Sequence, residues 1–249
     1  MKGIVLAGGL GKRLSPLTAI TNKHLLPVYD RPMIYHPIET LAKAGLQEIL
    51  LVVGPESAGD FMRLLGNGSQ FGLKRLDYAY QEKELGIAHA ISLAEPWVGQ
   101  DKMCVFLGDN ILEKGIAREV AQFRKQRRGA RVLLKEVPNA REYGVAEMSG
   151  LHIKRIAEKP RQPRSSYAVV GVYFYDPHVF KIIRGLKPSR RNELEVTDVN
   201  NAYIKRKQLT YGILDGFWAD CGASIDAYLA AQNLMARSHQ MTKALRRRR

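Results

Sequence analysis

The first half of the chain alternates short apolar runs with segments whose apolar residues recur at helical spacing. Continuous apolar or β-rich runs at 4–7, 48–53, 75–81 and 103–107 predict four strands. Helical spacing is found between and after these runs, at 34–42, 86–93 and 116–123. This order predicts an α/β fold, a doubly wound, mostly parallel (Rossmann-like) sheet flanked by helices.

The second half predicts a run of strands followed by helices. Short turns separate apolar segments at 131–137, 143–148, 153–157 and 167–175, and helical patterns return at 177–185, 193–207 and 224–237. We interpret residues 1–237 as a single mixed α/β domain in which the added antiparallel strands form the second half of one cleft. Residues 238–249 are expected to be a basic, poorly ordered C-terminal tail.

The composition is that of a soluble globular protein, with 45% hydrophobic and 25% charged residues. The first apolar run ends at Ala7, too early for a signal peptide, and no later stretch approaches the ~18 apolar residues of a membrane span. We therefore expect a cytoplasmic protein without a membrane partner. The two cysteines, Cys104 and Cys221, are expected to be buried free thiols.

The formal net charge of +15 calls for an anionic partner. Lys243 and Arg246–Arg249 contribute five of these charges at the C-terminus, and the other basic residues are scattered rather than clustered. Neither a zinc-finger nor an RRM-like signature is present. Small polyanionic substrates or an anionic surface stay open as partners, and nucleic-acid binding is not expected, although it stays an alternative of another class.

A glycine-rich segment directly follows the first predicted strand, at Gly8-Gly9-Leu10-Gly11-Lys12-Arg13. Glycines allow a tight turn that brings backbone N–H groups against phosphate oxygens, and Lys12 and Arg13 add positive charge there. The segment is neither a Walker A loop nor a complete dinucleotide-binding fingerprint. Lys23 follows in a segment of little helical or strand character and is a candidate third cation for a triphosphate.

These two segments, the second continuing as Lys23-His24-Leu25-Leu26-Pro27, resemble the sugar-phosphate nucleotidyltransferase family. The longer run KHLLPVYDRPM is similar to the thymidylyltransferases that act on glucose 1-phosphate. Further motifs occur in the order typical of the family: LGDN at 107–110, EYGV at 142–145, EKP at 158–160, YAVVGVY at 167–173, ELEVTDVN at 193–200 and WADCG at 218–222.

The resemblance implies roles for individual residues. The nucleotide would be bound by Gly8, Gly9, Gly11, Lys12, Arg13, Lys23, His24, Gln81, Gly86 and Asp109. The Gln81 amide, which can donate and accept, would face the pyrimidine base. The antiparallel strands would form the sugar-binding half, with the sugar phosphate bound by Asn110, Gly144, Glu158, Lys159, Val169, Tyr173 and Trp218.

Asp109 and Asp220 would hold Mg²⁺, the expected cofactor. Asp109 follows an apolar strand, where ligands bind in open α/β sheets, and Mg²⁺ needs only a few carboxylates besides phosphate oxygens and water. Structural roles stay open for the same positions. Asp109 and Asp220 could form turns, Glu158 and Lys159 a surface ion pair, and Gln81 a solvated strand end. His24 could be a packed loop histidine.

The implied reaction transfers a nucleotidyl group from dTTP to α-D-glucose 1-phosphate, giving dTDP-glucose and pyrophosphate for deoxysugar or polysaccharide synthesis. Arg13, Lys23 and Lys159 would be catalytic, because the attacking phosphate is already an anion and the barrier is mainly electrostatic. UTP is the alternative donor, and a non-catalytic nucleotide-sugar sensor is the alternative class. The family implies a homo-oligomer. Because longer members carry further C-terminal helices, the resemblance does not extend to their feedback control.

Overall fold

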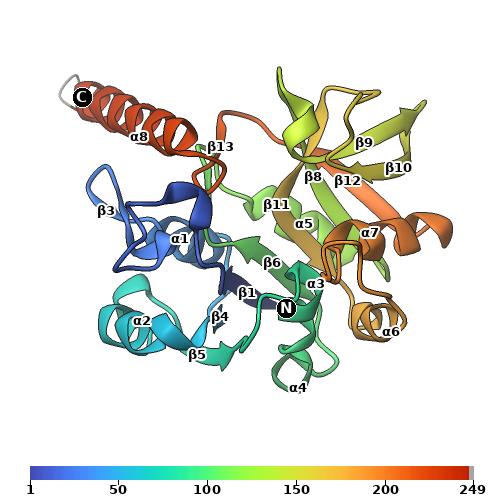
Figure 1. Ribbon diagram of the computed structural model, residues 1–249, viewed down its shortest axis with the longest axis horizontal. Helices are drawn as coiled ribbons and strands as arrows, with labels where there is room; N and C mark the ends of the chain where they lie inside the picture. The colour runs from blue at the N-terminus through green and yellow to red at the C-terminus, as the bar shows by residue number, and fades with distance from the viewer. Residues whose placement is uncertain (247–249) are drawn as a thin grey trace.

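A single sheet organises the protein. The computed structural model describes residues 1–246, and within this range nine strands form one sheet with the path β10-β9-β11-β6-β1-β4-β5, to which β8 is joined through β11 and β12 through β8 (Figure 1). The strands are β1 (Lys2–Ala7), β4 (Glu48–Val53), β5 (Arg75–Tyr80), β6 (Met103–Leu107), β8 (Ala130–Glu136), β9 (Gly144–Ser149), β10 (His152–Glu158), β11 (Tyr167–Tyr175) and β12 (Leu209–Ile213).

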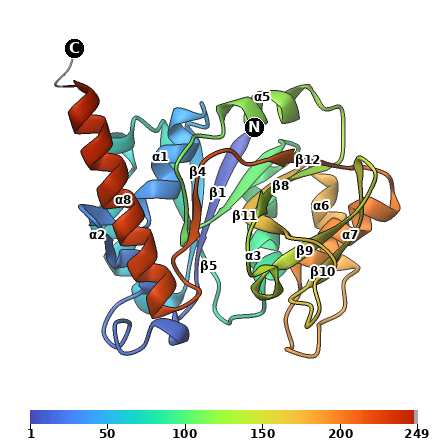
Figure 2. The same ribbon diagram turned by 90° about the horizontal axis from the view of Figure 1, so that it is seen from above.

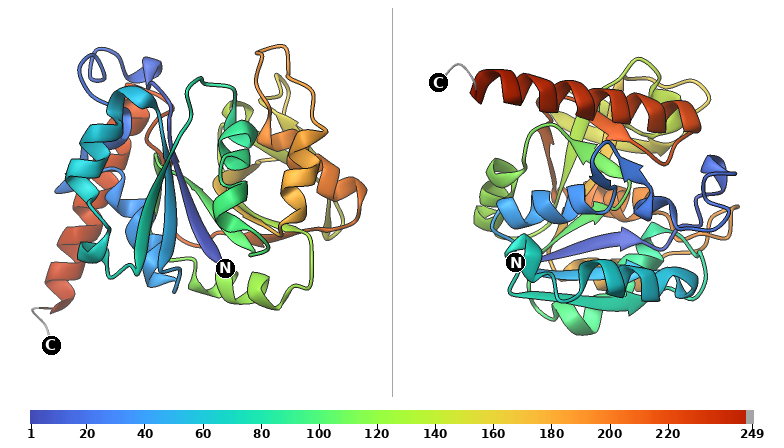
Figure 3. Two further views of the ribbon diagram at one scale, coloured as in Figure 1. Left: turned by 90° about the horizontal axis from the view of Figure 1, so that it is seen from below. Right: turned by 90° about the vertical axis from the view of Figure 1, so that its left-hand side faces the viewer.

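Four neighbouring strands, β5, β4, β1 and β6, run parallel. Their continuous apolar sequences fit burial on both faces, as parallel sheets require. In β1, Ile4 and Leu6 pack into the core on one face, whereas Val5 and Ala7 pack into the core on the other. The N-terminus lies at one end of β1 and the loop that follows β1 lies at the opposite end (Figure 3).

Helices cover both faces of the sheet (Figure 2). The core on one face includes side chains of α3 (Ile87–Ser92), α4 (Glu95–Val98), α6 (His178–Arg184) and α7 (Val196–Lys205). The core on the other includes side chains of α1 (Tyr35–Lys43), α2 (Ala58–Leu65) and α5 (Ala117–Lys125). The predicted fold class, a doubly wound sheet flanked by helices, is confirmed.

The direction of the sheet changes at β11. This strand is antiparallel to β6, β8 and β9, and β10 is antiparallel to β9. The predicted antiparallel addition therefore continues the parallel sheet instead of forming a separate layer. The strands β9, β10 and β11 lie to one side of β6 and the glycine-rich loop to the other (Figure 1).

A third, smaller core holds the C-terminal helix α8 (Ile225–Arg246) against the body. It includes residues of β2 (Pro27–Val28), β7 (Asn110–Leu112) and β13 (Trp218–Asp220). β2 pairs with β3 (Arg31–Pro32), and β7 pairs with β13. The sequence did not predict these short strands, or β12, α2 and α4, because two to eight residues carry little periodic signal.

The last helix is longer than the sequence pattern predicted. We expected a helix to 237 and a poorly ordered tail from 238, whereas the helical backbone of α8 continues to Arg246. Neither glycine nor proline occurs between Ser238 and Arg246, so nothing in this segment breaks the helix. Residues 247–249 lie outside the described range. Among the helices of residues 1–246, none has the length and hydrophobicity of a membrane span.

Candidate active site

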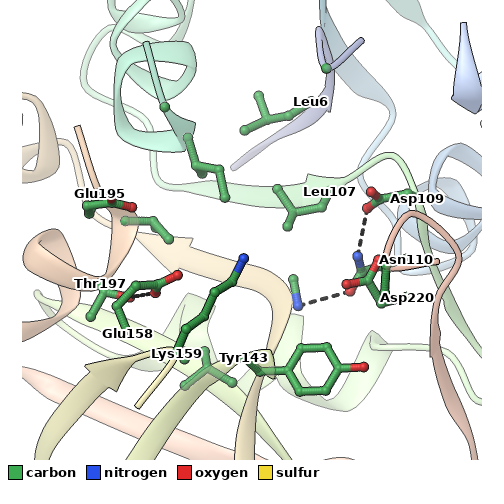
Figure 4. Close-up of a pocket in the computed structure, with 18 of the residues that line it drawn as sticks. Leu6, Leu107, Asp109, Asn110, Tyr143, Glu158, Lys159, Glu195, Thr197 and Asp220 are labelled. Atoms are coloured by element: carbon green, nitrogen blue, oxygen red, sulfur yellow. Dashed lines mark hydrogen bonds between the residues drawn. The ribbon is translucent and has the colours of Figure 1, made fainter. Parts of the chain in front are cut away.

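A cavity of about 940 Å³ lies at the carboxyl ends of the parallel strands and extends to the antiparallel half. Gly8 follows β1, Gln81 follows β5 and Asp109 lies two residues after β6, the edge at which open α/β sheets bind ligands. Figure 4 shows Asp109 and Asp220 on one side and Glu158 and Thr197 on the other. All the predicted site residues line this cavity except Gly11 and Lys12.

Gly11 shapes the glycine-rich loop. Its φ of 66° is left-handed, and an added Cβ would lie 2.9 Å from Cβ of Lys23. A side chain at this position would therefore push away the segment that carries Lys23. Lys12 is exposed and lies outside the cavity lining, whereas Arg13 lines it. A nucleotide contact from Gly11 or Lys12 stays a prediction.

Lys23 and Asp109 form a largely buried ion pair, with Nζ 2.5 Å from Oδ2. A short 3₁₀ turn, Lys23–Leu25, presents the lysine, and the side chain of Asn22 caps this turn by accepting from the backbone N–H of His24 at 3.0 Å. Burial disfavours the ammonium, but the Asp109 carboxylate outweighs it and raises the pKa of Lys23. Burial likewise opposes ionisation of Asp109, yet Lys23 holds its pKa well below the usual range.

Asp220 reaches the same position through strand pairing. In the β7–β13 register Asp220 is opposite Asn110, the neighbour of Asp109. Burial and then the charge of Asp109 raise the pKa of Asp220 to about 6. A Cβ added at Gly222 would collide with the Asp109 carboxylate, so the WADCG glycine allows the two segments to approach each other. The structure thus brings the two predicted metal ligands together.

The two aspartates fit a divalent cation. They are like charges in a poorly solvated site, and the raised pKa of Asp220 reflects their repulsion as well as burial. A cation between them would remove this repulsion. Within residues 1–246 no cluster of three or more acidic, histidine or cysteine side chains could by itself hold a metal. The pair therefore suits a cation that takes its remaining ligands from water and substrate phosphates, as Mg²⁺ does.

His24 lines the cavity but is only 2% exposed. Burial, and secondarily the charge of Lys23, lowers the pKa of His24 to about 3, so the ring is neutral. Its Nδ1 lies 2.7 Å from Oδ1 of Asn22, and a Cβ added at Gly108 would lie 2.7 Å from its Cδ2. This environment favours the packed loop histidine that the sequence left open.

Asn110 connects the Asp109 side of the cavity to its Trp218 side. Its Nδ2 donates to Oδ1 of Asp109 at 2.9 Å. Its Oδ1 accepts from the backbone N–H of Gly171 at 3.1 Å and from Nε1 of Trp218 at 2.7 Å. The Trp218 ring also contacts that of Tyr143, with centroids 4.8 Å apart. Asn110 thus orients Asp109 and Trp218 within the cavity wall.

At the end of β5, Gln81 is buried beside the loop that enters α3. Its Nε2 donates to the carbonyl oxygen of Gly86 at 3.2 Å and lies 3.0 Å from Nδ1 of His89. Gly86 has a φ of 98°, and a Cβ there would lie 2.8 Å from the backbone nitrogen of Leu194. Only glycine therefore permits this close packing.

On the antiparallel side, Glu158 ends β10 and Lys159 extends its ammonium into the cavity (Figure 4). Lys159 has a φ of 40°, a conformation that non-glycine residues rarely adopt. The hydroxyl of Thr197 donates to Oε2 of Glu158 at 2.6 Å. Gly144, Val169 and Tyr173 also line this side, and burial raises the pKa of Tyr173, so its hydroxyl stays neutral.

Several lining residues were missed by the sequence reading, among them Tyr143, Arg191, Glu195 and Thr197. Arg191 lies 2.9 Å from Glu195 and 3.5 Å from Glu158, so it neutralises part of the acidic charge there. Glu195 and Thr197 belong to the ELEVTDVN motif, whose presence was noted without a role for its members. Tyr143 belongs to EYGV in the same way.

The cavity thus places a carboxylate pair between cations from two parts of the fold. Arg13 and Lys23 come from the loops after β1, and Lys159 comes from the antiparallel half. Such an arrangement can hold two polyanions and a divalent cation together, which is the requirement of phosphoryl-group transfer.

Comparison with known proteins identifies the family. The family model described as nucleotidyl transferase matches residues 2–238. The chain belongs to the nucleotidyl transferase family. Among its relatives is the glucose-1-phosphate thymidylyltransferase of Neisseria meningitidis, which is 43% identical over 235 residues, 93% of this chain and 81% of the relative. A second thymidylyltransferase, from Actinoplanes, is 42% identical over 95% of this chain and 78% of that protein.

Solved structures of this nucleotidyltransferase fold agree. A Bacillus anthracis protein, assigned as a glucose-1-phosphate thymidylyltransferase and solved with sucrose, has a TM-score of 0.90 at 47% identity and covers 94% of each chain. A UDP-glucose pyrophosphorylase solved with UDP-glucose has a TM-score of 0.83 at 26% identity, covering 95% of this chain and 98% of that one. The resemblance inferred from the motifs is confirmed at the level of family, fold and enzyme class.

Proposed function

We propose that the protein transfers a thymidylyl group from dTTP to α-D-glucose 1-phosphate, giving dTDP-glucose and pyrophosphate for deoxysugar or polysaccharide synthesis. The observation that carries this proposal is the placement of Asp109 and Asp220 side by side between a glycine-rich loop and the Lys159 side of the cavity. The choice of dTTP and glucose 1-phosphate as substrates is supported by the relatives that are named glucose-1-phosphate thymidylyltransferases.

In this mechanism a sugar-phosphate oxygen attacks the α-phosphorus of dTTP in line with the departing pyrophosphate. The attacking oxygen is already ionised, so no general base is needed. Lys159 positions the sugar phosphate, Lys23 neutralises charge at the α-phosphate and Arg13 stabilises the pyrophosphate. Catalysis then rests on positioning and on charge stabilisation.

Asp109 and Asp220 are the residues that would hold Mg²⁺. When bound, this ion supplies positive charge for the phosphate oxygens. Lys23 has a second role here, because its ion pair with Asp109 partly neutralises that carboxylate and joins the Lys23–Leu25 turn to the end of β6. The side-chain amide of Asn110 fixes the orientation of the Asp109 carboxylate by donating a hydrogen bond to it. Cytoplasmic location and homo-oligomer formation stay predictions.

On the sugar side, Glu158 is placed to accept hydrogen bonds from sugar hydroxyls, with Thr197 fixing one of its oxygens. Val169 and Tyr173 would form the apolar floor, and Trp218 would bound the sugar pocket beside Tyr143. These contacts favour a hexose, because Glu158 can accept hydrogen bonds from its hydroxyls and Val169 and Tyr173 can pack against its ring.

A UTP-dependent reaction is the second candidate, and the UDP-glucose pyrophosphorylase relationship favours it. Thymine and uracil offer the same carbonyl and N–H groups to Gln81 and differ only in the C5 methyl. Discrimination between them therefore depends on packing, which contributes only ~1–3 kcal/mol for one methyl-sized group.

A pyrophosphate-release assay tests the proposal. The protein is incubated with dTTP or UTP and with glucose, mannose or N-acetylglucosamine 1-phosphate, in Mg²⁺ or in EDTA. We expect dTTP with glucose 1-phosphate and Mg²⁺ to give the highest kcat/KM and EDTA to abolish turnover. A higher kcat/KM with UTP would select the second candidate, and no release from any pair would refute the transferase function.

A further inference from the structure

The side-chain amide of Gln81 is held in one orientation by two neighbours. Its Nε2 lies 3.2 Å from the carbonyl oxygen of Gly86. A carbonyl oxygen can only accept, so the amide nitrogen and not the amide oxygen must face Gly86. Gly86 is itself fixed by its packing against Leu194, so this acceptor does not move aside.

The second neighbour, His89, takes the other hydrogen of the same amide nitrogen. Its Nδ1 lies 3.0 Å from Nε2 of Gln81. With Nε2 of Gln81 acting as the donor, Nδ1 of His89 must accept, which assigns the tautomer with the proton on Nε2 of His89. His89 lies on α3 and outside the cavity lining, so it acts on a ligand only through Gln81.

As a result Gln81 offers the cavity an acceptor. Both hydrogen bonds that its side chain makes within the described residues leave from Nε2. The oxygen Oε1 lies toward Gly8, where an added Cβ would be 3.0 Å away, and both residues line the cavity. Neither Nε2 hydrogen is left for a base unless one of these two bonds breaks.

We propose that His89 is a positioning residue for base selection: it holds Gln81 with Oε1 toward the nucleotide, so that the site accepts a base presenting an N–H and rejects one presenting a lone pair. Thymine and uracil present N3–H to this oxygen. Cytosine presents the N3 lone pair, which Oε1 repels. The inference rests on the proposed function, because it assumes that the cavity binds a pyrimidine triphosphate at Gln81.

His89→Leu tests this role, because it replaces the ring and its acceptor nitrogen with an apolar side chain of similar size. Turning the Gln81 amide, so that Nε2 donates to cytosine N3 and Oε1 accepts from the cytosine amino group, then breaks only the hydrogen bond to Gly86 instead of two hydrogen bonds. We expect the affinity ratio of dTTP to dCTP to fall about tenfold, because one hydrogen bond fewer opposes this turn. His89→Asn, whose Oδ1 can accept from Nε2, should keep the ratio within about threefold of wild type.

The measurement is calorimetric binding of dTTP and of dCTP with Mg²⁺ and without sugar phosphate. A double-mutant cycle with Gln81→Leu separates positioning from a general structural effect, because His89→Leu should change nothing further once Gln81 is gone. His178→Leu, at an exposed histidine on α6, is the matched control and should keep the wild-type ratio. Thermal unfolding of each variant shows whether it is folded.

Three outcomes would overturn the inference: an unchanged ratio in His89→Leu, an equal fall in the Gln81→Leu background, or an equal fall in His89→Asn. Each would show that the acceptor on His89 does not act through Gln81. The proposed function fails separately, if wild-type protein binds dTTP but releases no pyrophosphate with glucose 1-phosphate. The binding ratio would then still decide the role of His89.

Discussion

The ammonium of Lys23 lies 2.5 Å from the carboxylate of Asp109, although 86 residues separate them in the chain. The ion pair joins the segment that follows the glycine-rich loop to the end of β6. Asp220 stands beside it with a raised pKa, so the site holds two carboxylates and one nearby ammonium before any substrate binds. Because of this imbalance, the two carboxylates contribute differently to the stability of the folded protein, although both have the same proposed function.

Asp109→Asn and Asp220→Asn should both abolish Mg²⁺-dependent turnover but change stability in opposite ways. Losing the Asp109 charge leaves Lys23 buried without its partner, which costs about 3 kcal/mol or more in free energy of unfolding. Losing the Asp220 charge removes a like-charge repulsion, so the free energy of unfolding stays equal or rises. Urea denaturation in EDTA measures both. A larger loss of stability in Asp220→Asn than in Asp109→Asn would contradict this account.

Arg13→Ala should lower kcat by ~10²-fold or more, because a charge-stabilising group at the leaving pyrophosphate is removed. Lys12→Ala removes the neighbouring cation, which lies outside the cavity lining: a nucleotide contact from Lys12 would affect the KM for dTTP, and we expect less than about a threefold change in kcat. Steady-state pyrophosphate release measures both variants. Equal losses in the two would show that the loop acts only through its total charge.

Lys159→Gly should separate stability from activity. The left-handed backbone at φ 40° costs a lysine roughly 1 kcal/mol, which glycine avoids while losing more chain entropy on folding. We therefore expect the free energy of unfolding to change by less than about 1 kcal/mol while kcat/KM falls by ~10²-fold. Lys207→Gly, at φ 56° two residues after the end of α7 and outside the cavity lining, should keep both quantities near wild type. Full activity in Lys159→Gly would remove Lys159 from the mechanism.

Thr197→Val should raise the KM for glucose 1-phosphate by about 3–10-fold and leave the KM for dTTP unchanged. The lost hydroxyl no longer fixes Oε2 of Glu158, so the carboxylate must be ordered when the sugar binds. Thr210→Val is the control, since Thr210 lies on β12 outside the cavity lining and its hydroxyl donates to Oε1 of Gln126 at the end of α5. A parallel rise in both KM values would mean that Thr197 supports the whole cavity rather than the sugar half.

Trp218 should report ligand binding by its fluorescence. The chain has two tryptophans, and only Trp218 lines the cavity within the described residues, where it bonds Asn110 and contacts Tyr143. Trp97 bonds Asp77, outside the cavity lining. Titration with dTDP-glucose should therefore change the emission of wild type and of Trp97→Phe but not that of Trp218→Phe. A ligand response that survives in Trp218→Phe would place the sugar nucleotide elsewhere.

The sequence by itself determined the kinds of elements and the loop that opens the site. β1, β4 and β6 were readable because strands buried on both faces are continuously apolar. The loop from Gly8 to Arg13 could be predicted as a phosphate-binding turn, because its glycines and its two cations are adjacent in the sequence. The family motifs likewise occur as short contiguous runs, so they were recognised without knowledge of how they meet.

Tertiary structure alone decided which of these runs meet, because strand pairing joins residues far apart in the chain. The β7–β13 register brings Asp220 beside Asp109, and neither segment predicts the other. Thr197 acts on Glu158 through the packing of α7 on β10, and Arg191 reaches Glu158 from the loop before α7, which no local pattern shows. His89 orients Gln81 only because the chain turns at Gly86 and brings α3 back to β5. Side-chain orientation depends on such contacts, which exist only once the chain has folded.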